Sequence, residues 1–206
     1  VLHGRNSARL EKVHDEIVAA GHPRPAIAVI DLAKAQGPAY FDLVARLKDA
    51  YGRLDGLLHN AAMLGDRTPL EQYDVGTWHQ VMHLNLTVPF ILTQQLMPLL
   101  RAAPDASVVF TSSGVGRRGR AYWGAYAVSK FGVEGLAQVL ADETRDATRI
   151  RVNCVNPGGV RTAMRRNAYP AELPESRPEP VAVMGPYLWL MGPDSRGCTG
   201  QSFDCQ

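Results

Sequence analysis

Short apolar runs alternate with helical patterns along the whole 206-residue chain, and this alternation limits the possible folds more than any other feature. Strands buried on both faces of a parallel sheet are nearly continuous in apolar residues and end in small or polar ones. Runs of this kind cover residues 26–32, 54–62, 106–113 and 150–158. We also expect a strand in residues 1–4, so that the chain begins part-way through a strand.

Helices are expected between these strands, over residues 6–20, 38–51, 74–100 and 123–146. Asn6 or Ser7 is a suitable N-cap for the first helix, and Gly21 is a suitable stop. Pro89 should break or kink the third. Strands that alternate with helices predict an α/β fold with a doubly wound, Rossmann-like parallel sheet and helices on both faces.

Ligands of such sheets bind outside the carboxyl ends of the strands. We therefore expect the functional site among the residues that follow the apolar runs, which are Gly4-Arg5, Asp31, Asn60-Ala61-Ala62, Ser112-Ser113 and Asn156-Pro157-Gly158.

Gly114–Gly119 formally matches the dinucleotide fingerprint G-x-G-x-x-G. That fingerprint must follow the first strand and open a helix directly, with an acidic residue about 20 positions later at the end of the next strand. Here the strand is a late one, four residues separate the motif from the helix, and the acidic residue, Asp142, lies inside that helix. We interpret the segment as a flexible loop rather than as a phosphate site.

Tyr126 and Lys130 are the strongest catalytic candidates. Their i,i+4 spacing puts both side chains on one face of the helix. A free tyrosine has a pKa of about 10, and a nearby ammonium favours the phenolate, so the pair can act as a general acid/base. Ser113 ends the preceding strand and can donate a hydrogen bond to a carbonyl oxygen.

Five segments in one order and spacing, "HNAA" (59–62), Asn85, "FTSS" (110–113), "YAVSK" (126–130) and "NPGGVRT" (156–162), resemble the short-chain dehydrogenase/reductase family. The resemblance implies an NAD(P)-binding domain that moves hydride between nicotinamide and a small carbonyl/alcohol substrate. It makes Tyr126 the acid/base, and Lys130 the group that lowers the pKa of Tyr126 and binds the nicotinamide ribose. It makes Ser113 the group that orients the carbonyl, and Asn85 the holder of a water that relays protons to Lys130.

The resemblance also assigns the cofactor contacts. Asn60 and Ala61 would line the adenosine side, and Asp31 with Leu32 would contact adenine. The nicotinamide would be held by the segment that contains Pro157, Gly158, Val160 and Thr162.

Arg5 determines the cofactor that we expect. In this fold an acidic residue at the end of the second strand binds the ribose 2′-hydroxyl of NAD, whereas an arginine accommodates the 2′-phosphate of NADP. The corresponding strand of this chain ends Gly4-Arg5 without a carboxylate, and a guanidinium matches phosphate geometry. We predict NADP(H) over NAD(H).

The chain departs from the family at its start, where the phosphate loop T-G-x-x-x-G-x-G is absent. We expect residues 1–206 to be a single Rossmann-type domain that lacks its first βα unit, a fragment of a longer enzyme. Residues 163–182 occupy the position of the family's substrate lid, and their Pro- and Glu-rich part, residues 167–180, is expected to be a mobile loop.

Composition and charge limit the classes of binding partner that we expect for this chain. A net charge of +2 does not favour nucleic acid, and no apolar run approaches the ~18–20 residues that span a bilayer. Three cysteines without the spacing of a disulfide framework favour the cytoplasm. No metal site is expected, since His79 and His83 lack a third ligand. The resemblance implies a homodimer or homotetramer.

Two alternatives stay open. Arg117, Arg118 and Arg120 could be solvated, or they could meet an anionic substrate. The chain could also be a non-catalytic nucleotide-binding or regulatory module on the same fold, although such a module would be expected to lose one of the four catalytic candidates.

Overall fold

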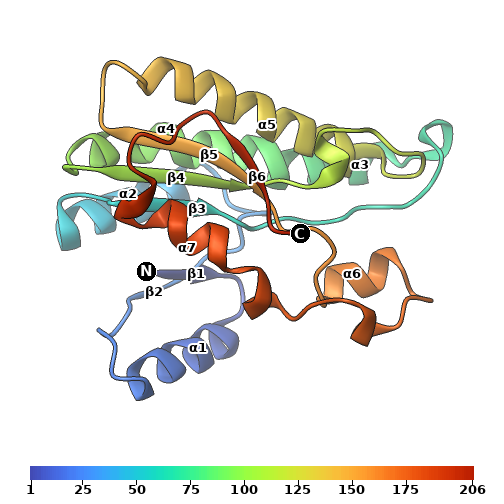
Figure 1. Cartoon of the computed structure of the whole chain (residues 1–206), viewed down its shortest axis with the longest axis horizontal. Helices are drawn as coiled ribbons and strands as arrows, with labels where there is room; N and C mark the ends of the chain where they lie inside the picture. Colours follow the sequence, from blue (N-terminus) through green and yellow to red (C-terminus); the bar gives the residue numbers. More distant parts are fainter. The chain divides into compact units, whose positions relative to one another are not determined.

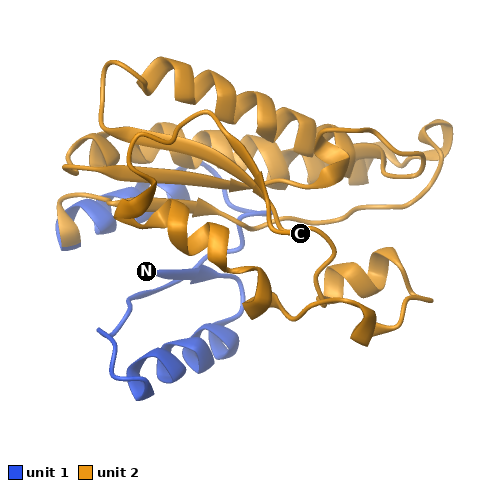
Figure 2. Cartoon of the chain, viewed as in Figure 1, with its two compact units in different colours: residues 1–50 blue, residues 51–206 orange.

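The computed structural model describes all 206 residues, which form two compact units, residues 1–50 and residues 51–206 (Figures 1 and 2). Each unit contains a parallel sheet of its own. None of the helices combines the length and the apolar character that crossing a bilayer requires.

The first unit contains strands β1 (Leu2–Gly4) and β2 (Ile27–Val29) and helices α1 (Ser7–Ala19) and α2 (Gly37–Tyr51). The two strands pair in parallel, with Leu2 opposite Ile27. Asn6 is the N-cap of α1, and its side chain accepts a hydrogen bond from the backbone N–H of Arg9 at 2.9 Å. Beyond α1, Gly21 has a φ of +79°, a backbone conformation that favours glycine and ends helices. The expected start and stop of this helix are therefore confirmed.

The second unit is built on a sheet of four parallel strands, β3 (Gly56–His59), β4 (Ala106–Thr111), β5 (Ile150–Asn156) and β6 (Ser202–Asp204), in that spatial order. One line of paired residues crosses the whole sheet through His59, Phe110, Cys154 and Ser202. Strands β3, β4 and β5 are shorter than the apolar runs that predict them, because the last residues of each run turn away into the loops that carry the polar side chains.

Alternate residues of the sheet face two separate parts of the core. Val108 and Phe110 pack toward α5 (Gly124–Thr144) and α4 (Val88–Arg101). Val109 and Val155 pack toward α7 (Gly185–Met191). All four side chains are completely buried, and burial contributes about 1.5–3 kcal/mol for each apolar side chain of this size. Helices cover both faces of this sheet, as Figure 1 shows, and the expected α/β architecture is confirmed.

Residues 74–100, predicted as one helix with a break or kink at Pro89, form three successive helical segments. These are α3 (Val75–Met82), a π-helical turn (His83–Thr87) and α4. Pro89 lies in the first turn of α4 and does not end a helix. The residue four positions before it, Asn85, belongs to the wider π-turn, and irregular backbone is where a missing proline N–H can be accommodated.

The helices and strand that follow residue 162 were not predicted from the sequence. These are α6 (Ala163–Ala168), α7, β6 and the 3₁₀ segments Pro174–Ser176, Pro180–Val183 and Pro193–Ser195. Two further 3₁₀ segments lie earlier in the chain, at Leu70–Gln72 and Gly114–Gly116. The segment expected to be a featureless loop over residues 167–180 contains a 3₁₀ turn and is tied by ion pairs from Arg165 and Arg177 to Glu172.

Candidate active site

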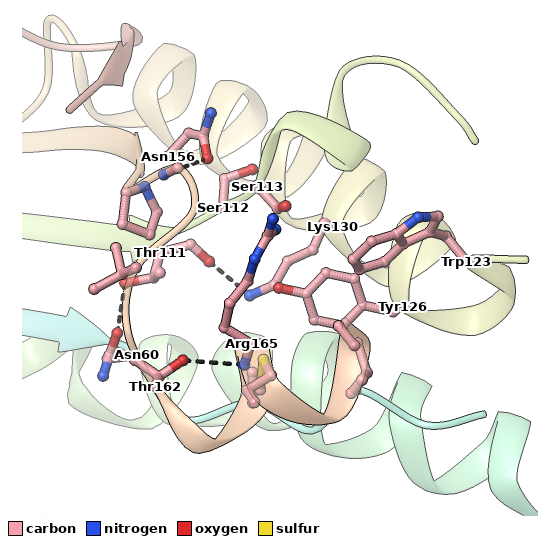
Figure 3. A pocket seen from close by; sticks show the side chains of 17 residues that line it. Asn60, Thr111, Ser112, Ser113, Trp123, Tyr126, Lys130, Asn156, Thr162 and Arg165 are labelled. Atoms are coloured by element: carbon pink, nitrogen blue, oxygen red, sulfur yellow. Dashed lines mark hydrogen bonds between the residues drawn. The ribbon is translucent and has the colours of Figure 1, made fainter. Parts of the chain in front are cut away.

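A cavity of about 260 Å³ lies at the carboxyl ends of β3, β4 and β5 in the second unit (Figure 3). Its lining combines polar side chains from the strand ends and α5 with apolar side chains from the neighbouring loops and α6. The lining residues are Asn60, Ala62, Leu64, Thr111, Ser112, Ser113, Trp123, Tyr126, Lys130, Asn156, Pro157, Gly158, Val160, Thr162, Met164, Arg165 and Ala168.

Tyr126 and Lys130 both reach this cavity from α5, one helical turn apart (Figure 3). Their exposed fractions are only 8% and 3%. The Lys130 ammonium donates a hydrogen bond to the backbone carbonyl of Thr111 at 2.6 Å, and its nitrogen lies 5.7 Å from the centre of the Tyr126 ring. Packing therefore holds both candidate catalytic groups in place.

Burial shifts the pKa of both groups. It lowers the pKa of Lys130 to about 8, against the opposing influence of Cys154 and Glu134. It raises the pKa of the Tyr126 phenol, and a hydrogen bond with Ser113 opposes that shift only in part. We expected Lys130 to lower the pKa of Tyr126, but burial is the larger effect on this phenol. At neutral pH Tyr126 is therefore protonated.

Gly116, in the loop after Ser113, explains one glycine of the formal G-x-G-x-x-G. A Cβ atom at Gly116 would lie 2.8 Å from the Cβ of Lys130 and 2.9 Å from its carbonyl carbon. A residue without a side chain is thus required for this loop to pack against the catalytic helix. Gly116 therefore has a packing role, which agrees with the interpretation that the motif is not a phosphate site.

Of the three arginines that could meet an anionic substrate, Arg118 and Arg120 are exposed, and both alternatives stay open for them. Arg117 is bound within the chain. Its guanidinium lies 3.1 Å from Glu134 of α5 and 2.9 Å from both carboxylate oxygens of Asp204 in β6. It also donates hydrogen bonds to Ser202 and to the carbonyl of Phe203. All of its donor nitrogens are engaged, so Arg117 ties the loop to the helix and the sheet.

Asn85 is buried outside the cavity lining, with an exposed fraction of 1%. Its side-chain oxygen accepts a hydrogen bond from the N–H of Met63 at 2.8 Å, and its NH₂ group donates to the carbonyl of Met63 and the hydroxyl of Ser129. Asn85 thereby joins the loop after β3 to α5. Its expected role in holding a water stays a prediction.

The segment after β5 is shaped by its own side chains. Asn156 accepts a hydrogen bond from the N–H of Gly158 at 3.0 Å, and Gly158 has a φ of +74°. Thr162 caps α6 by accepting a hydrogen bond from the N–H of Arg165 at 3.2 Å. This local structure brings the predicted nicotinamide contacts Pro157, Gly158, Val160 and Thr162 to the cavity.

The predicted adenosine contacts belong to both units. Asn60 lines the cavity and accepts a hydrogen bond from the Thr111 hydroxyl, whereas Ala62 lines it in place of Ala61. The three other predicted contacts, Arg5, Asp31 and Leu32, belong to the first unit. Arg5 is exposed after β1, Asp31 accepts a hydrogen bond from the N–H of Ala33 at 3.1 Å, and Leu32 is buried.

Three lining residues, Leu64, Met164 and Ala168, were not singled out from the sequence. They are apolar residues in a loop or in a short helix, where no periodicity marks them. Ala62 was among the strand-end residues expected at the site, and it lines the cavity.

A Rossmann-like parallel sheet with serine, tyrosine and lysine side chains on one cavity at its carboxyl end defines a class of dehydrogenases and reductases. The family model for short chain dehydrogenases matches residues 1–173. The chain therefore belongs to the short-chain dehydrogenase/reductase family of oxidoreductases, as its motifs predicted.

Known relatives are similar over the whole chain. It is 48% identical to the uncharacterized oxidoreductase YciK of Escherichia coli K12, over all of this chain and 81% of that protein. A solved structure of a protein from Pseudomonas syringae is 52% identical, with a TM-score of 0.97, covering 100% of this chain and 83% of that one. Another, from Shigella flexneri and complexed with NADP, is 48% identical with a TM-score of 0.95, covering 100% of this chain and 85% of that one.

Proposed function

We propose that this oxidoreductase uses NADP(H) to transfer hydride between the nicotinamide and a carbonyl/alcohol substrate, with Tyr126 as acid/base. The observation that carries the proposal is the convergence of Ser113, Tyr126 and Lys130 on one cavity at the carboxyl end of the sheet. A proton donor, a carbonyl-orienting hydroxyl and a fixed cation are the groups that carbonyl reduction requires.

In the reduction direction, the carbonyl carbon receives hydride from the nicotinamide while the carbonyl oxygen receives a proton from the Tyr126 hydroxyl. The products are the alcohol and the oxidised cofactor. Ser113 donates a hydrogen bond to the same oxygen and so stabilises the charge that develops there. The raised pKa of Tyr126 keeps its proton available at neutral pH. In the reverse direction the positive charge of Lys130 favours the phenolate.

The cavity offers donors that fit the nicotinamide half of the cofactor. An ammonium has three N–H donors, and Lys130 uses one of them on Thr111, which leaves two for ribose hydroxyls. The hydroxyl of Ser112 is buried without a partner in the chain. The 156–162 segment contributes Pro157, Gly158, Val160 and Thr162 to the lining of the cavity. We assign Pro157, Gly158, Val160 and Thr162 to the nicotinamide on these grounds.

The preference for NADP(H) rests on Arg5, which is exposed directly after β1. The Shigella relative complexed with NADP supports the same cofactor for this chain. We retain Asn60 and Ala61 for the adenosine side, and Asp31 with Leu32 for adenine, as predictions from the family resemblance.

A fluorescence titration of the chain with NADPH and NADH tests the cofactor assignment. Arg5→Glu should weaken NADPH binding about 10- to 100-fold and leave NADH binding little changed, because one charge-assisted contact is lost. Arg24→Glu, the same charge change in an exposed loop before β2, is the control. If the ratio of NADPH affinity to NADH affinity is unchanged in Arg5→Glu, Arg5 does not determine the cofactor preference.

We further propose that residues 163–182 form the substrate lid and that the enzyme acts as a homodimer or homotetramer in the cytoplasm. Helices α4 and α5 expose apolar side chains that a partner subunit could cover, namely Phe90, Val128, Phe131 and Val139. Sedimentation that finds a monomer at micromolar concentration would contradict the assembly.

A further inference from the structure

The charged side chains that line the cavity are all of one sign. They are Lys130 and Arg165, and no carboxylate side chain lines the cavity. Lys130 is assigned to the ribose in the proposed function, whereas the chemistry of Ser113 and Tyr126 makes no use of Arg165. The Arg165 side chain extends from α6 into the cavity that those two residues also line (Figure 3). A cleft lined by one sign of charge attracts ligands of the opposite sign.

Arg165 belongs to the same wall of the cavity as Tyr126. Its guanidinium lies 3.9 Å from the centre of the Tyr169 ring. The centre of that ring is 6.0 Å from the centre of the Trp123 ring, which in turn is 5.6 Å from the centre of the Tyr126 ring. Helix α6 packs on this aromatic cluster through Ala168. The guanidinium and the proposed acid/base therefore belong to one packed group.

A single carboxylate is shared between two guanidiniums beside the cavity. Nε and Nη2 of Arg165 lie 2.5 and 2.6 Å from the two carboxylate oxygens of Glu172. Nε and Nη2 of Arg177 lie 2.8 and 2.6 Å from one of these oxygens. The hydrogen bonds from Arg165 and then Arg177 lower the pKa of Glu172 to about 2, so the carboxylate is ionised at neutral pH. Because one negative charge cannot balance two positive charges, this group keeps a net positive charge.

Arg67 adds a further positive charge behind the same wall. Its guanidinium donates a hydrogen bond to the carbonyl of Ala168 at 2.5 Å, and its Nε atom is buried without a hydrogen-bond partner. It lies 4.4 Å from the centre of the Trp123 ring and 4.9 Å from that of the Tyr169 ring. None of these neighbours carries a negative charge, so the charge of Arg67 is also unbalanced.

Arg165 keeps a donor for an additional anion. Its Nη1 group makes no hydrogen bond within the chain, while Nε and Nη2 bind Glu172. The contact with Glu172 holds the guanidinium in place, so little side-chain freedom is lost when a ligand binds. A hydrogen bond between a guanidinium and a carboxylate is roughly twice as strong as one between neutral groups.

On the basis of the proposed function, we infer that the substrate is a small oxo acid, or the corresponding hydroxy acid, whose carboxylate binds to Arg165. The reacting oxygen of the same molecule meets Ser113 and Tyr126. The carboxylate balances positive charge that Glu172 leaves over, and a cavity of about 260 Å³ favours a compact acid over a bulky anion. Arg165 then determines specificity, within the segment proposed as the substrate lid.

Three oxo acids and their primary amides form matched pairs of probes, because each amide has nearly the shape of its acid without the charge. The acids are 2-oxobutanoate, 4-oxopentanoate and 4-oxocyclohexane-1-carboxylate. Ligand-observed NMR with saturating NADP⁺ measures affinity, and NADPH oxidation measures kcat/KM. We expect at least one acid to bind about tenfold or more tightly than its amide.

The inference is overturned if no acid binds more tightly than its amide, or if no probe binds. If the acid is preferred in binding but no probe is reduced, the ligand class stands and the proposed function fails. If only the amides are reduced, the proposed function stands and the inference fails.

Two variants with opposite expected effects assign the preference to Arg165. Arg165→Met should lower the affinity for the preferred acid about tenfold and change the affinity for its amide little. Glu172→Gln should raise the ratio of acid affinity to amide affinity, because it leaves both guanidiniums without their shared carboxylate. Arg166→Met is the control, since it removes an exposed charge from α6 outside the cavity lining. A general disturbance of the segment would weaken both ligands and leave the ratio unchanged.

The diphosphate of the cofactor is the other anion that Arg165 could bind, and the same variant distinguishes the two. An NADPH titration of Arg165→Met should give an affinity close to that of the parent chain. An unchanged ratio of acid affinity to amide affinity in Arg165→Met overturns the inference. If NADPH affinity falls about tenfold in that case, Arg165 serves the cofactor instead.

Discussion

The ammonium of Lys130 donates a hydrogen bond to the carbonyl oxygen of Thr111, the last residue of β4, at 2.6 Å. This contact fixes the catalytic helix against the end of the central strand and leaves two N–H donors toward the cavity. Burial acts against the charge of the same ammonium and brings its pKa to about 8. Lys130 is therefore a group whose protonation changes within an accessible pH range.

NADPH binding should weaken as the pH rises through about 8. Because the lowered pKa belongs to the chain before the cofactor binds, Lys130 is charged below that pH and neutral above it. A cofactor that binds the charged form loses up to about tenfold in affinity per pH unit above the pKa. Fluorescence titrations at pH 7, 8, 9 and 9.5 measure this. The Lys130→Met variant should bind NADPH more weakly, and its affinity should not change with pH. If this variant shows the same pH dependence as the parent chain, another group causes that dependence.

Gly116→Ala should destabilise the chain by about 1–3 kcal/mol, because the new Cβ meets the backbone of Lys130. The displaced helix should also bind NADPH more weakly. Gly119→Ala is a matched control, since a Cβ there meets nothing within 4 Å. Urea unfolding compares the two variants, and equal stability would mean that the loop does not press on the helix as described.

Arg117→Ala should lower the free energy of unfolding by about 2 kcal/mol, because it leaves the carboxylate of Glu134, whose side chain is only 10% exposed, without its cation. Arg118→Ala, one residue further along and exposed, should change it by less than about 0.5 kcal/mol. Thermal or urea unfolding measures both. If the two variants were equally stable, the network between loop, helix and β6 would carry no net stability.

Asn85→Ala should destabilise the chain by about 1–3 kcal/mol, because it leaves the backbone N–H of Met63 without a partner. Hydrogen exchange should then show faster exchange at Met63 than in the parent chain. Protection that stays unchanged at Met63 would contradict the role given to Asn85 in holding the loop after β3.

The parts of the fold and site that could be predicted from the sequence are those encoded over short distances. Strands β3, β4 and β5 follow from apolar runs, and the shared face of Tyr126 and Lys130 follows from helical periodicity. Asn6 and Gly21 mark the ends of α1 because capping is a local interaction.

The features that escaped prediction depend on residues far apart in the chain. Arg117 finds its partner Asp204 87 positions away, and no local pattern encodes such a contact. The need for glycine at position 116 arises only when its loop meets Lys130. The π-turn around Asn85 has the composition of an ordinary helix, so the sequence placed the irregularity at Pro89 instead.

A measurement of hydride transfer tests the proposed function of Tyr126 and the cavity most directly. The chain is mixed with NADPH that carries deuterium at the transferable position and with a panel of neutral and charged carbonyl compounds, and the products are analysed by mass spectrometry. We predict deuterium on the carbinol carbon of at least one product, and about 10²- to 10⁴-fold slower transfer in Tyr126→Phe, which should still bind NADPH. Saturable NADPH binding without transfer to any carbonyl, or equal transfer by Tyr126→Phe, would contradict it.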